Sequence, residues 1–313
     1  MANNEHILLE PEHLARLKSL QLKAKSVVEG VLSGLHKSPH HGSSVEFAEH
    51  KEYAPGDEIK HIDWRVYAKS DKYYVKHYEQ ETNLQAMLLL DASSSMLYKS
   101  NDGLHSKWEY ASIIAASVAY LLLRQQDSVG LSVVGSDVTC FVPPRNRSTH
   151  LMHLCKLIVS SEPQPNTPTD LLTGVKHITE VFPRRGLVFV FSDFFDNDPE
   201  FMRVLRQLKG RRQQVHLFHV LDPWELTFPF EQMTLFQSME SVSKVLAEPR
   251  AMRATYLRAI QAFIQNLRKD CLEHGMEYHL LDTSVAIDDA IGDFVMGKKN
   301  ISPHDTGQSR HGV

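Results

Sequence analysis

The 313-residue sequence contains few cysteines and no apolar run long enough to span a membrane. Its three cysteines, Cys140, Cys155 and Cys271, lie far apart and form no C-x-x-C pair, so neither a disulfide framework nor a cysteine zinc site is expected. The most apolar window, residues 111–123, falls short of the ~20 residues that a transmembrane helix needs. The N-terminus lacks the basic segment and apolar core of a secretory signal. These absences predict a soluble, cytoplasmic protein.

The sequence also lacks a basic excess and several nucleotide-binding motifs. Its formal net charge is −4 and its sequence pI is about 6.5, so it carries no electrostatic footprint for nucleic acid. There is no G-x-x-x-x-G-K-[ST] phosphate loop, no G-x-G-x-x-G after a strand and no G-x-S-x-G nucleophile elbow. We therefore expect neither nucleic-acid binding nor a nucleotide site of these types.

Residues 11–35 carry apolar side chains at steps of three and four, which predicts an amphipathic helix with a basic opposite face. This helix either packs on the main domain with its basic face in solvent, which we favour, or contacts a membrane surface or a partner. The loop that follows, residues 36–42, contains three histidines. No acidic or cysteine partner stands beside them, so a polar loop is favoured over a metal site.

Residues 45–80 predict a small β-rich segment ahead of the main domain. Residues 45–49 and 73–80 are rich in β-branched and aromatic side chains, which is typical of strands, and Pro55-Gly56 between them fits the centre of a type II turn. We expect this segment to pair with, or pack against, an edge of the main sheet. Three of its charged residues, Asp57, Asp63 and Arg65, form either a helix cap and a salt bridge around Trp64 or a docking surface for a partner.

From residue 85 onward apolar strands alternate with helices, which predicts an α/β fold with a doubly wound, mostly parallel sheet. The predicted strands are 85–91, 128–135, 139–144, 186–192, 214–222 and 276–283, of which 139–144 is an edge strand ended by prolines. The predicted helices are 106–125, 150–160, 170–182, 199–209, 250–273 and 286–296. Residues 223–249 form a polar and aromatic stretch with no predicted element. The expected organisation is an N-terminal helix and β-rich segment (1–84), an α/β domain (85–296) and a disordered tail (297–313).

Three loops at the expected carboxyl ends of the strands carry oxygen ligands. In an open α/β sheet, ligands bind outside these ends. The first loop holds Asp91, Ser93 and Ser95, whose alternate spacing lets the three side chains face one point. The second loop holds Thr167 and Thr169, and the third holds Asp193. Carboxylate and hydroxyl oxygens suit Mg²⁺, and a site with few negative charges leaves the ion able to accept a carboxylate from a partner.

A structural role for the first loop is the simpler alternative. Asp91 and its serines would then cap the next helix, but that helix starts with its own capping box, Ser106-x-x-Glu109. A cap must stand next to the first helical turn, and more than ten residues separate Asp91 from it. The pattern therefore favours a metal site.

The D-x-S-x-S, threonine and aspartate trio resembles the metal-ion-dependent adhesion site of von Willebrand factor A-type domains. The upstream sequence SVEFAEHKEYAPGDEIKHIDWRVYAKSDKYYVKHYEQET resembles the signature of the bacterial family known as domain of unknown function fifty-eight. The resemblance implies a von Willebrand A-like fold and frequent association with MoxR-type AAA ATPases, without a settled activity. It also implies the metal ligands Asp91, Ser93, Ser95, Thr169 and Asp193. The usual glycines before the threonine are replaced by PQPNTP, so Thr167 stays an alternative to Thr169.

The favoured function is a non-enzymatic binding module. It uses Mg²⁺, or another divalent cation such as Mn²⁺, to engage an acidic residue of a partner, as an adaptor between a MoxR-type AAA ATPase and a client protein. The first alternative is a Mg²⁺-dependent phosphohydrolase with Asp91 as nucleophile, although such enzymes usually place a second acid where this sequence has Ser93. The second alternative is a structural domain whose metal site is vestigial because Pro168 stiffens the second loop.

Overall fold

The computed structural model describes residues 11–37, 51–52, 74–75, 84–168, 170–182, 185–195, 199–239 and 243–297. The chain forms two compact units, one of Met1–Ser33 with Leu84–Val313 and one of Gly34–Asn83. In the smaller unit, β1 (Lys51–Glu52) and β2 (Tyr74–Val75) pair in antiparallel orientation. The predicted strand 45–49 and the candidate docking residues Asp57, Asp63 and Arg65 lie outside the described residues, as do residues 298–313 of the predicted tail.

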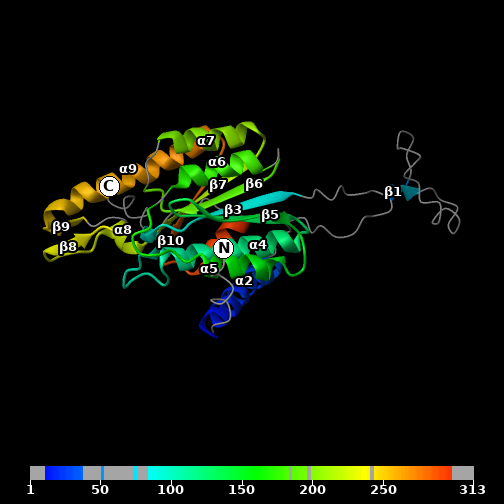
Figure 1. Cartoon of the computed structure of the whole chain (residues 1–313), viewed down its shortest axis with the longest axis horizontal. Helices are drawn as coiled ribbons and strands as arrows, with labels where there is room; N and C mark the ends of the chain where they lie inside the picture. Colours follow the sequence, from blue (N-terminus) through cyan, green and yellow to red (C-terminus); the bar gives the residue numbers. More distant parts are fainter. Residues whose placement is uncertain are drawn as a thin grey trace, which may run out of the picture. The chain divides into compact units, whose positions relative to one another are not determined.

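The larger unit is built on a six-stranded sheet with the order β10-β7-β6-β3-β4-β5 (Figure 1). Five strands are parallel, and the edge strand β5 runs antiparallel to β4. Only residues 135–137 connect β4 to β5, too few for a crossover, so these two strands form a hairpin. The mostly parallel α/β fold predicted from the sequence is confirmed. The strands are β3 (Gln85–Asp91), β4 (Ser128–Val134), β5 (Val138–Arg145), β6 (Leu187–Ser192), β7 (Gln214–Leu221) and β10 (Glu277–Asp282).

Helices cover both faces of the sheet, which is why its central strands are apolar on both sides. Figure 1 shows α6, α7 and α9 on one side of the sheet, and α4 and α5 on the other. Both layers enclose a continuous hydrophobic cluster against the strands. The bounds of these helices, and of the C-terminal helix α10, are α4 (Lys107–Arg124), α5 (His150–Ser160), α6 (Leu171–Val181), α7 (Pro199–Gly210), α9 (Pro249–Glu273) and α10 (Ile287–Val295).

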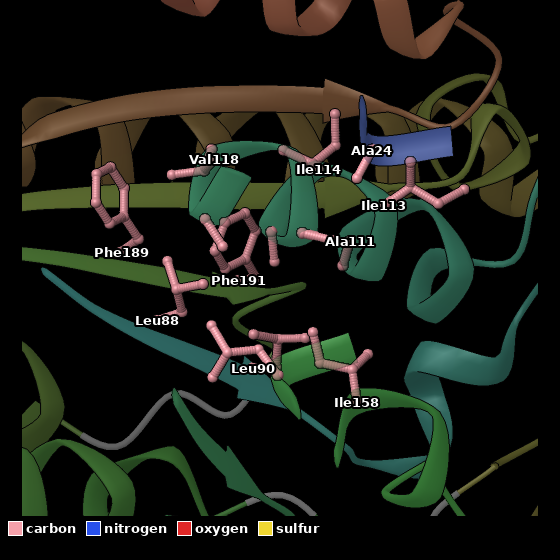
Figure 2. Packing of buried hydrophobic residues seen from close by; sticks show 14 of the residues in the cluster. Ala24, Leu88, Leu90, Ala111, Ile113, Ile114, Val118, Ile158, Phe189 and Phe191 are labelled. Atoms are coloured by element: carbon pink, nitrogen blue, oxygen red, sulfur yellow. The ribbon is translucent and has the colours of Figure 1, made fainter. Parts of the chain in front are cut away.

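The helix α4 is the centre of the core on its side of the sheet. Leu88 and Leu90 of β3 lie in the same cluster as Phe191 of β6, and Figure 2 shows them facing α4. Most residues of α4 are buried, including Ala111 and Val118, as expected for a helix that is apolar almost all round. This packing holds Lys107, the first residue of α4, beside Asp193, which follows β6.

The N-terminal helix α2 (Pro11–Lys37) packs on the larger unit, as favoured from the sequence. Its apolar side chains Leu20 and Ala24 are buried, and Figure 2 shows Ala24 beside α4. Arg16 forms an ion pair with Glu162, 2.6 Å between Nη1 and Oε2. The helix runs two residues beyond its predicted end at residue 35. Among the helices that the structure describes, none is both long and apolar enough to cross a membrane.

The stretch 223–249, which carried no predicted element, contains three short ones. They are α8 (Pro223–Thr227), β8 (Thr234–Gln237) and β9 (Lys244–Ala247), and the two strands form an antiparallel hairpin. The elements are four or five residues long, too short for their apolar periodicity to appear in the sequence. Together they build one side of the candidate site described below.

Candidate functional site

The candidate site lies where the strand order reverses. On one side of β3 the sheet continues through β4 to β5. On the other side it continues through the later strands β6, β7 and β10, so the direction of the connections reverses between β3 and β6. A crevice forms outside the carboxyl ends of two such neighbouring strands, and it is the usual ligand site of doubly wound folds. Asp91 is the last residue of β3, and Asp193 directly follows β6. The topology therefore brings these two aspartates to the two sides of this crevice.

Hydrogen bonds hold the first loop in one arrangement. The backbone N–H of Ser93 donates to Asp91 Oδ1 at 2.9 Å, and the hydroxyl of Ser192 donates to Asp91 Oδ2 at 2.6 Å. Asp91 is 0% exposed, so both of its oxygens are fixed by protein donors. The loop continues as a short 3-10 helix, η2 (Ser94–Leu97), which turns Ser95 back toward the crevice.

The predicted ligands of the first and third loops form one connected group. The hydroxyl oxygens of Ser93 and Ser95 lie 3.0 Å apart, and the Ser95 hydroxyl donates to the carboxylate of Asp193. Asp193 is 2% exposed and also accepts a hydrogen bond from the backbone N–H of Phe195 at 3.3 Å. Four of the five predicted ligands thus belong to one hydrogen-bonded group.

The spacing of the oxygen atoms in this group can be compared with that of the ligands of a magnesium ion. Two adjacent ligands of an octahedral Mg²⁺, each about 2.1 Å from the ion, lie about 3.0 Å from one another. The hydroxyl oxygens of Ser93 and Ser95 have this spacing. The donor set is also chemically suitable, because it consists only of hydroxyl and carboxylate oxygens. The residues present therefore fit a hard divalent cation.

The second loop is joined to the first through its backbone. Ser94 donates to the carbonyl oxygen of Thr167 through its backbone N–H, at 2.9 Å, and through its hydroxyl, at 3.1 Å. The Ser94 hydroxyl also lies 2.7 Å from the carbonyl oxygen of Met239, beyond the hairpin strand β8. Thr169 lies outside the described residues, so the choice between Thr167 and Thr169 stays open. Asp170 caps α6 by accepting from the N–H of Thr173 at 2.9 Å.

A buried lysine lies against this group. The ammonium of Lys107, the first residue of α4, donates to Asp193 Oδ2 at 2.8 Å and to Glu225 Oε1 at 2.7 Å. The side chain of Lys107 is only 1% exposed. Its ammonium also lies 5.2 Å from the centre of the Phe195 ring. Lys107 therefore balances part of the charge of the carboxylates at the site.

The pKa values of these groups follow from burial and charge. Burial, aided by the nearby charge of Asp193, raises the pKa of Asp91 to about 7, and it also raises the pKa of Glu225. Burial opposes the ionisation of Asp193 as well, but the Lys107 ammonium outweighs it and the pKa of Asp193 is lowered. Burial acts against the charge of Lys107, yet Asp193 and Glu225 hold its pKa above the ordinary value. Asp193 and Glu225 thus share the Lys107 ammonium, and Asp91 lies close enough to Asp193 for their charges to interact.

A cavity of about 540 Å³ adjoins this charged cluster. Ser95, Lys107 and Asp193 line one part of it, so the cavity reaches the candidate ligands directly. The rest of the lining is mainly aromatic and includes Phe195, Trp224, Phe228, Phe230, Phe236 and Tyr256. Next to it, the β8–β9 hairpin exposes large apolar side chains, namely Leu235, Val245 and Leu246, each more than half exposed. The cavity thus has charged residues on the side of the candidate ligands and mainly aromatic residues elsewhere.

The family known as "Protein of unknown function DUF58" matches residues 49–264, more than half of the chain. The chain belongs to the DUF58 family. This DUF58 protein is 27% identical over 255 residues to uncharacterized proteins of Mycobacterium bovis (Mb1516) and Mycobacterium tuberculosis (Rv1480). Each match covers 81% of this chain and 79% of the relative.

Solved structures similar to this DUF58 protein have low sequence identity. The conserved hypothetical protein BatB from Bacteroides thetaiotaomicron is 17% identical, with 69% of this chain and 98% of that chain covered and a TM-score of 0.43. The SpRpn10 VWA domain is 9% identical, with 71% and 100% covered and a TM-score of 0.41.

Two charged residues of the DUF58 site, Lys107 and Glu225, are not among the residues predicted from the sequence. Lys107 follows Ser106 in the capping box that was recognised, and nothing in that box indicates that the lysine turns toward the sheet. Glu225 had a usable signal, because Asp222-Pro223-x-Glu225 is itself a capping box with proline at the first helical position. Recognising α8 would have placed an acid close to the end of β7.

Proposed function

We propose that this protein is a metal-dependent protein-binding module. A Mg²⁺ ion held by Asp91, Ser93, Ser95 and Asp193, with a threonine of the second loop, engages a carboxylate of a partner protein. The observation that carries the proposal is the pair of serine hydroxyls 3.0 Å apart between two buried aspartates at the strand-order reversal. The metal supplies a positive charge with a coordination position open to the partner's carboxylate.

The buried lysine supports the binding of an acidic partner. Asp91, Asp193 and Glu225 together carry more negative charge than one divalent ion removes. Lys107 contacts both Asp193 and Glu225, so it removes the excess that would otherwise repel an incoming carboxylate. The loaded site is then close to neutral, with its positive charge concentrated at the ion.

The aromatic cavity indicates which residue stands next to the partner's carboxylate. The cavity reaches Ser95 and Asp193, so a side chain that follows the coordinated acid enters it directly. The aromatic lining favours a large apolar side chain over a polar one. We therefore propose that the partner segment contains an aspartate or glutamate adjacent to a large apolar residue, with the exposed side chains of the β8–β9 hairpin contacting its flanks.

The partner class follows from the family resemblance. The resemblance of the sequence to the DUF58 signature implies association with a MoxR-type AAA ATPase, and we propose that this protein serves such an ATPase as an adaptor for a client. The ATPase of the source organism, purified, is the direct probe. Its binding is expected in Mg²⁺ and is expected to be lost in chelator. Equal binding in both would favour a vestigial metal site.

Calorimetric titration of the chelator-treated protein with Mg²⁺ tests the metal site. Wild type is expected to bind one ion, and the double variant Ser93→Ala/Ser95→Ala to lose that binding, because it removes two neutral ligands without changing the charge. Ser94→Ala is the matched control in the same loop, since the Ser94 hydroxyl faces backbone carbonyls. Parallel titrations of Thr167→Ala and Thr169→Ala identify the second-loop ligand. The same heat of binding in the double variant and in wild type would refute the site.

Peptide binding tests the cavity. A fluorescent peptide with glutamate followed by phenylalanine is expected to bind ~10-fold or more tightly than one with glutamate followed by alanine, because a buried phenylalanine side chain contributes ~1.5–3 kcal/mol. Phe230→Ala should reduce this preference, whereas Met152→Ala, an exposed apolar residue of α5, should not. A glutamine–phenylalanine peptide controls for the carboxylate.

The geometry does not favour the phosphohydrolase alternative. A nucleophilic aspartate has to meet its substrate directly, whereas Asp91 is 0% exposed and is not among the residues that line the cavity. Phosphoester hydrolysis is therefore expected to stay at background with and without Mg²⁺. Turnover that disappears in Asp91→Asn would replace the binding-module proposal.

A further inference from the structure

A second cluster of metal-binding side chains lies away from the candidate site, on the neighbouring strands β7 and β10. His216 of β7 stands opposite Glu277 of β10 in the parallel register, and His279 lies two residues further along β10. All three side chains are on one face of the sheet, because residues two apart on a strand share a face. Their nearest metal-binding atoms all lie within 4.8 Å of one another.

The three facing atoms are too far apart for good hydrogen bonds but are spaced as ligands of zinc. His216 Nδ1 lies 3.4 Å from His279 Nε2, and Glu277 Oε2 lies 3.5 Å from the former and 3.7 Å from the latter. Hydrogen bonds between such atoms are usually about 2.7–3.2 Å long. Two ligands of a tetrahedral Zn²⁺, each about 2.05 Å from the ion, lie about 3.3 Å apart. One ion just above the plane of the three atoms would bind all three in tetrahedral geometry after a small contraction of the triangle.

The surroundings hold the two imidazoles in place. His216 and His279 are each 8% exposed, and aromatic rings pack against both: Phe189 stacks on His216 at 4.9 Å and Phe218 on His279 at 4.7 Å, between ring centres. Phe294 of α10 packs edge-on against both histidines. Burial lowers the pKa of each histidine to about 4, so both are neutral imidazoles, the form that binds metal, near pH 7.

We propose that His216, Glu277 and His279 form a zinc site that fastens the edge strand β10 to β7. Two imidazole nitrogens and one carboxylate oxygen are three of the four ligands of a tetrahedral zinc ion. The side chain of Glu277 is 66% exposed, so solvent reaches the cluster and water supplies the fourth ligand. The edge strand gains a link that does not depend on its backbone ladder. Zinc binding therefore stabilises the fold without taking part in the partner site.

Zinc titration of the full-length protein, prepared without a histidine tag and treated with chelator, tests this site. A colorimetric zinc indicator measures affinity by competition, and Co²⁺ substitution gives the visible absorption of a tetrahedral site. Wild type is expected to bind zinc and to show this absorption. Glu277→Gln should weaken zinc binding at least 10-fold, and His279→Ala should abolish both signals. At a free zinc concentration 100-fold above the dissociation constant, the unfolding equilibrium constant of wild type should fall about 100-fold.

Two control variants keep the result specific. His274→Ala changes a histidine outside the cluster, whose Nδ1 lies 2.8 Å from the carbonyl oxygen of Asp270, and should bind zinc as wild type does. Asp91→Asn should also keep the zinc signal, which separates this site from the magnesium site. If His279→Ala fails to fold, Glu277→Gln decides the outcome, because its exposed side chain tolerates the change. Equal zinc affinity of wild type and Glu277→Gln, or no zinc binding by wild type, would overturn the proposal and leave a packed pair of histidines.

Discussion

Four strands of the main sheet end at or next to an aspartate, and all four carboxylates make the same local hydrogen bond. They are Asp91, Asp193, Asp222 and Asp282. In each, Oδ1 accepts from the backbone N–H two residues further on, at 2.8–3.3 Å. This bond shapes the turn and identifies no ligand site. Asp91 and Asp193 differ because they flank the strand-order reversal and are linked through Ser93 and Ser95.

The residue-level prediction from sequence depended on a combination of features, and the role of these residues as metal ligands stays a prediction. Asp91, Ser93, Ser95 and Asp193 were selected by residue spacing together with position after apolar strands, and the structure brings them together. Lys107 was not predicted, because the direction of its side chain depends on how α4 packs against the sheet. The local sequence around Lys107 contains only helix-capping information. Charge balance in a buried site is a property of the packed molecule.

Replacing Lys107 with methionine tests this charge balance. Methionine retains the length and burial of the side chain but removes the ammonium between Asp193 and Glu225. Breaking a buried ion pair in this way usually costs ~3–5 kcal/mol, because the partner charges stay buried without compensation. Urea denaturation in chelator should show a loss of this size for Lys107→Met. Lys176→Met, which breaks the exposed pair with Glu200, should leave the midpoint nearly unchanged. A small loss in both would mean that Lys107 is not needed for stability.

His150, which lies outside both proposed metal sites, is expected to make the stability of the fold depend on pH. Its Nε2 lies 2.7 Å from the carbonyl oxygen of Val129, and burial lowers its pKa below the ordinary 6.5. Below pH 6.5 the imidazole of this residue is therefore protonated more in the unfolded chain than in the folded chain. The free energy of unfolding consequently falls as the pH falls. The loss is up to ~1.4 kcal/mol per pH unit. Urea midpoints at pH 7 and pH 5 should differ less for His150→Gln than for wild type. His153→Gln, at an exposed neighbour, should behave like wild type; a reduced pH slope there too would contradict the assignment.

At the scale of elements, the helices and strands of the main sheet are predicted from the sequence more accurately than the short elements α8, β8 and β9, which are inserted between β7 and α9. The six sheet strands and the helices between residues 106 and 296 that were predicted match the structure within one residue at each end. Long buried elements have strong apolar patterns and clear end signals. The strands β8 and β9 have neither, because they are short and partly exposed, and the short helix α8 offers only the capping box at its start. Residues of α8 and β8 line the aromatic cavity, so elements with weak sequence signals shape the candidate site.

Asp222→Ala tests how the inserted elements are anchored. Asp222 is fully buried; it caps α8 by accepting from the N–H of Trp224 and also accepts from the N–H of Ser100, both at 2.9 Å. Losing the cap costs ~0.5–2 kcal/mol, and leaving the buried N–H of Ser100 unpaired costs ~1–3 kcal/mol. Denaturant titration should therefore show a loss of ~2–4 kcal/mol. Ser106→Ala, which removes only the cap of α4, should cost ~1 kcal/mol. Equal losses in the two variants would mean that the bond to Ser100 contributes nothing.

At the scale of the whole molecule, the order of the strands joins distant parts of the sequence into sites. The sequence predicts a doubly wound sheet, but it does not specify that β3 and β6 are neighbours or that His216 stands beside Glu277. Both juxtapositions depend on long-range packing and strand register, which no local pattern encodes. The position of the candidate site could be chosen from the sequence because the fold class itself indicates the carboxyl ends of the strands. The histidine cluster lies along two strands rather than at their ends, so no such rule pointed to it.

The two proposed metal sites are expected to act independently. Asp193 follows β6, whereas His279 is on β10, two strands away, which is about 10 Å across the sheet at the usual strand spacing. Sites this far apart with no shared contacts usually contribute additively to stability. Thermal unfolding in chelator, in Mg²⁺, in Zn²⁺ and in both ions should therefore give stabilisations that sum within ~0.5 kcal/mol. Ser93→Ala/Ser95→Ala should remove only the magnesium increment, and Glu277→Gln only the zinc increment. A variant that loses both increments would show that the two sites are coupled through β6 and β7, and their independence would have to be abandoned.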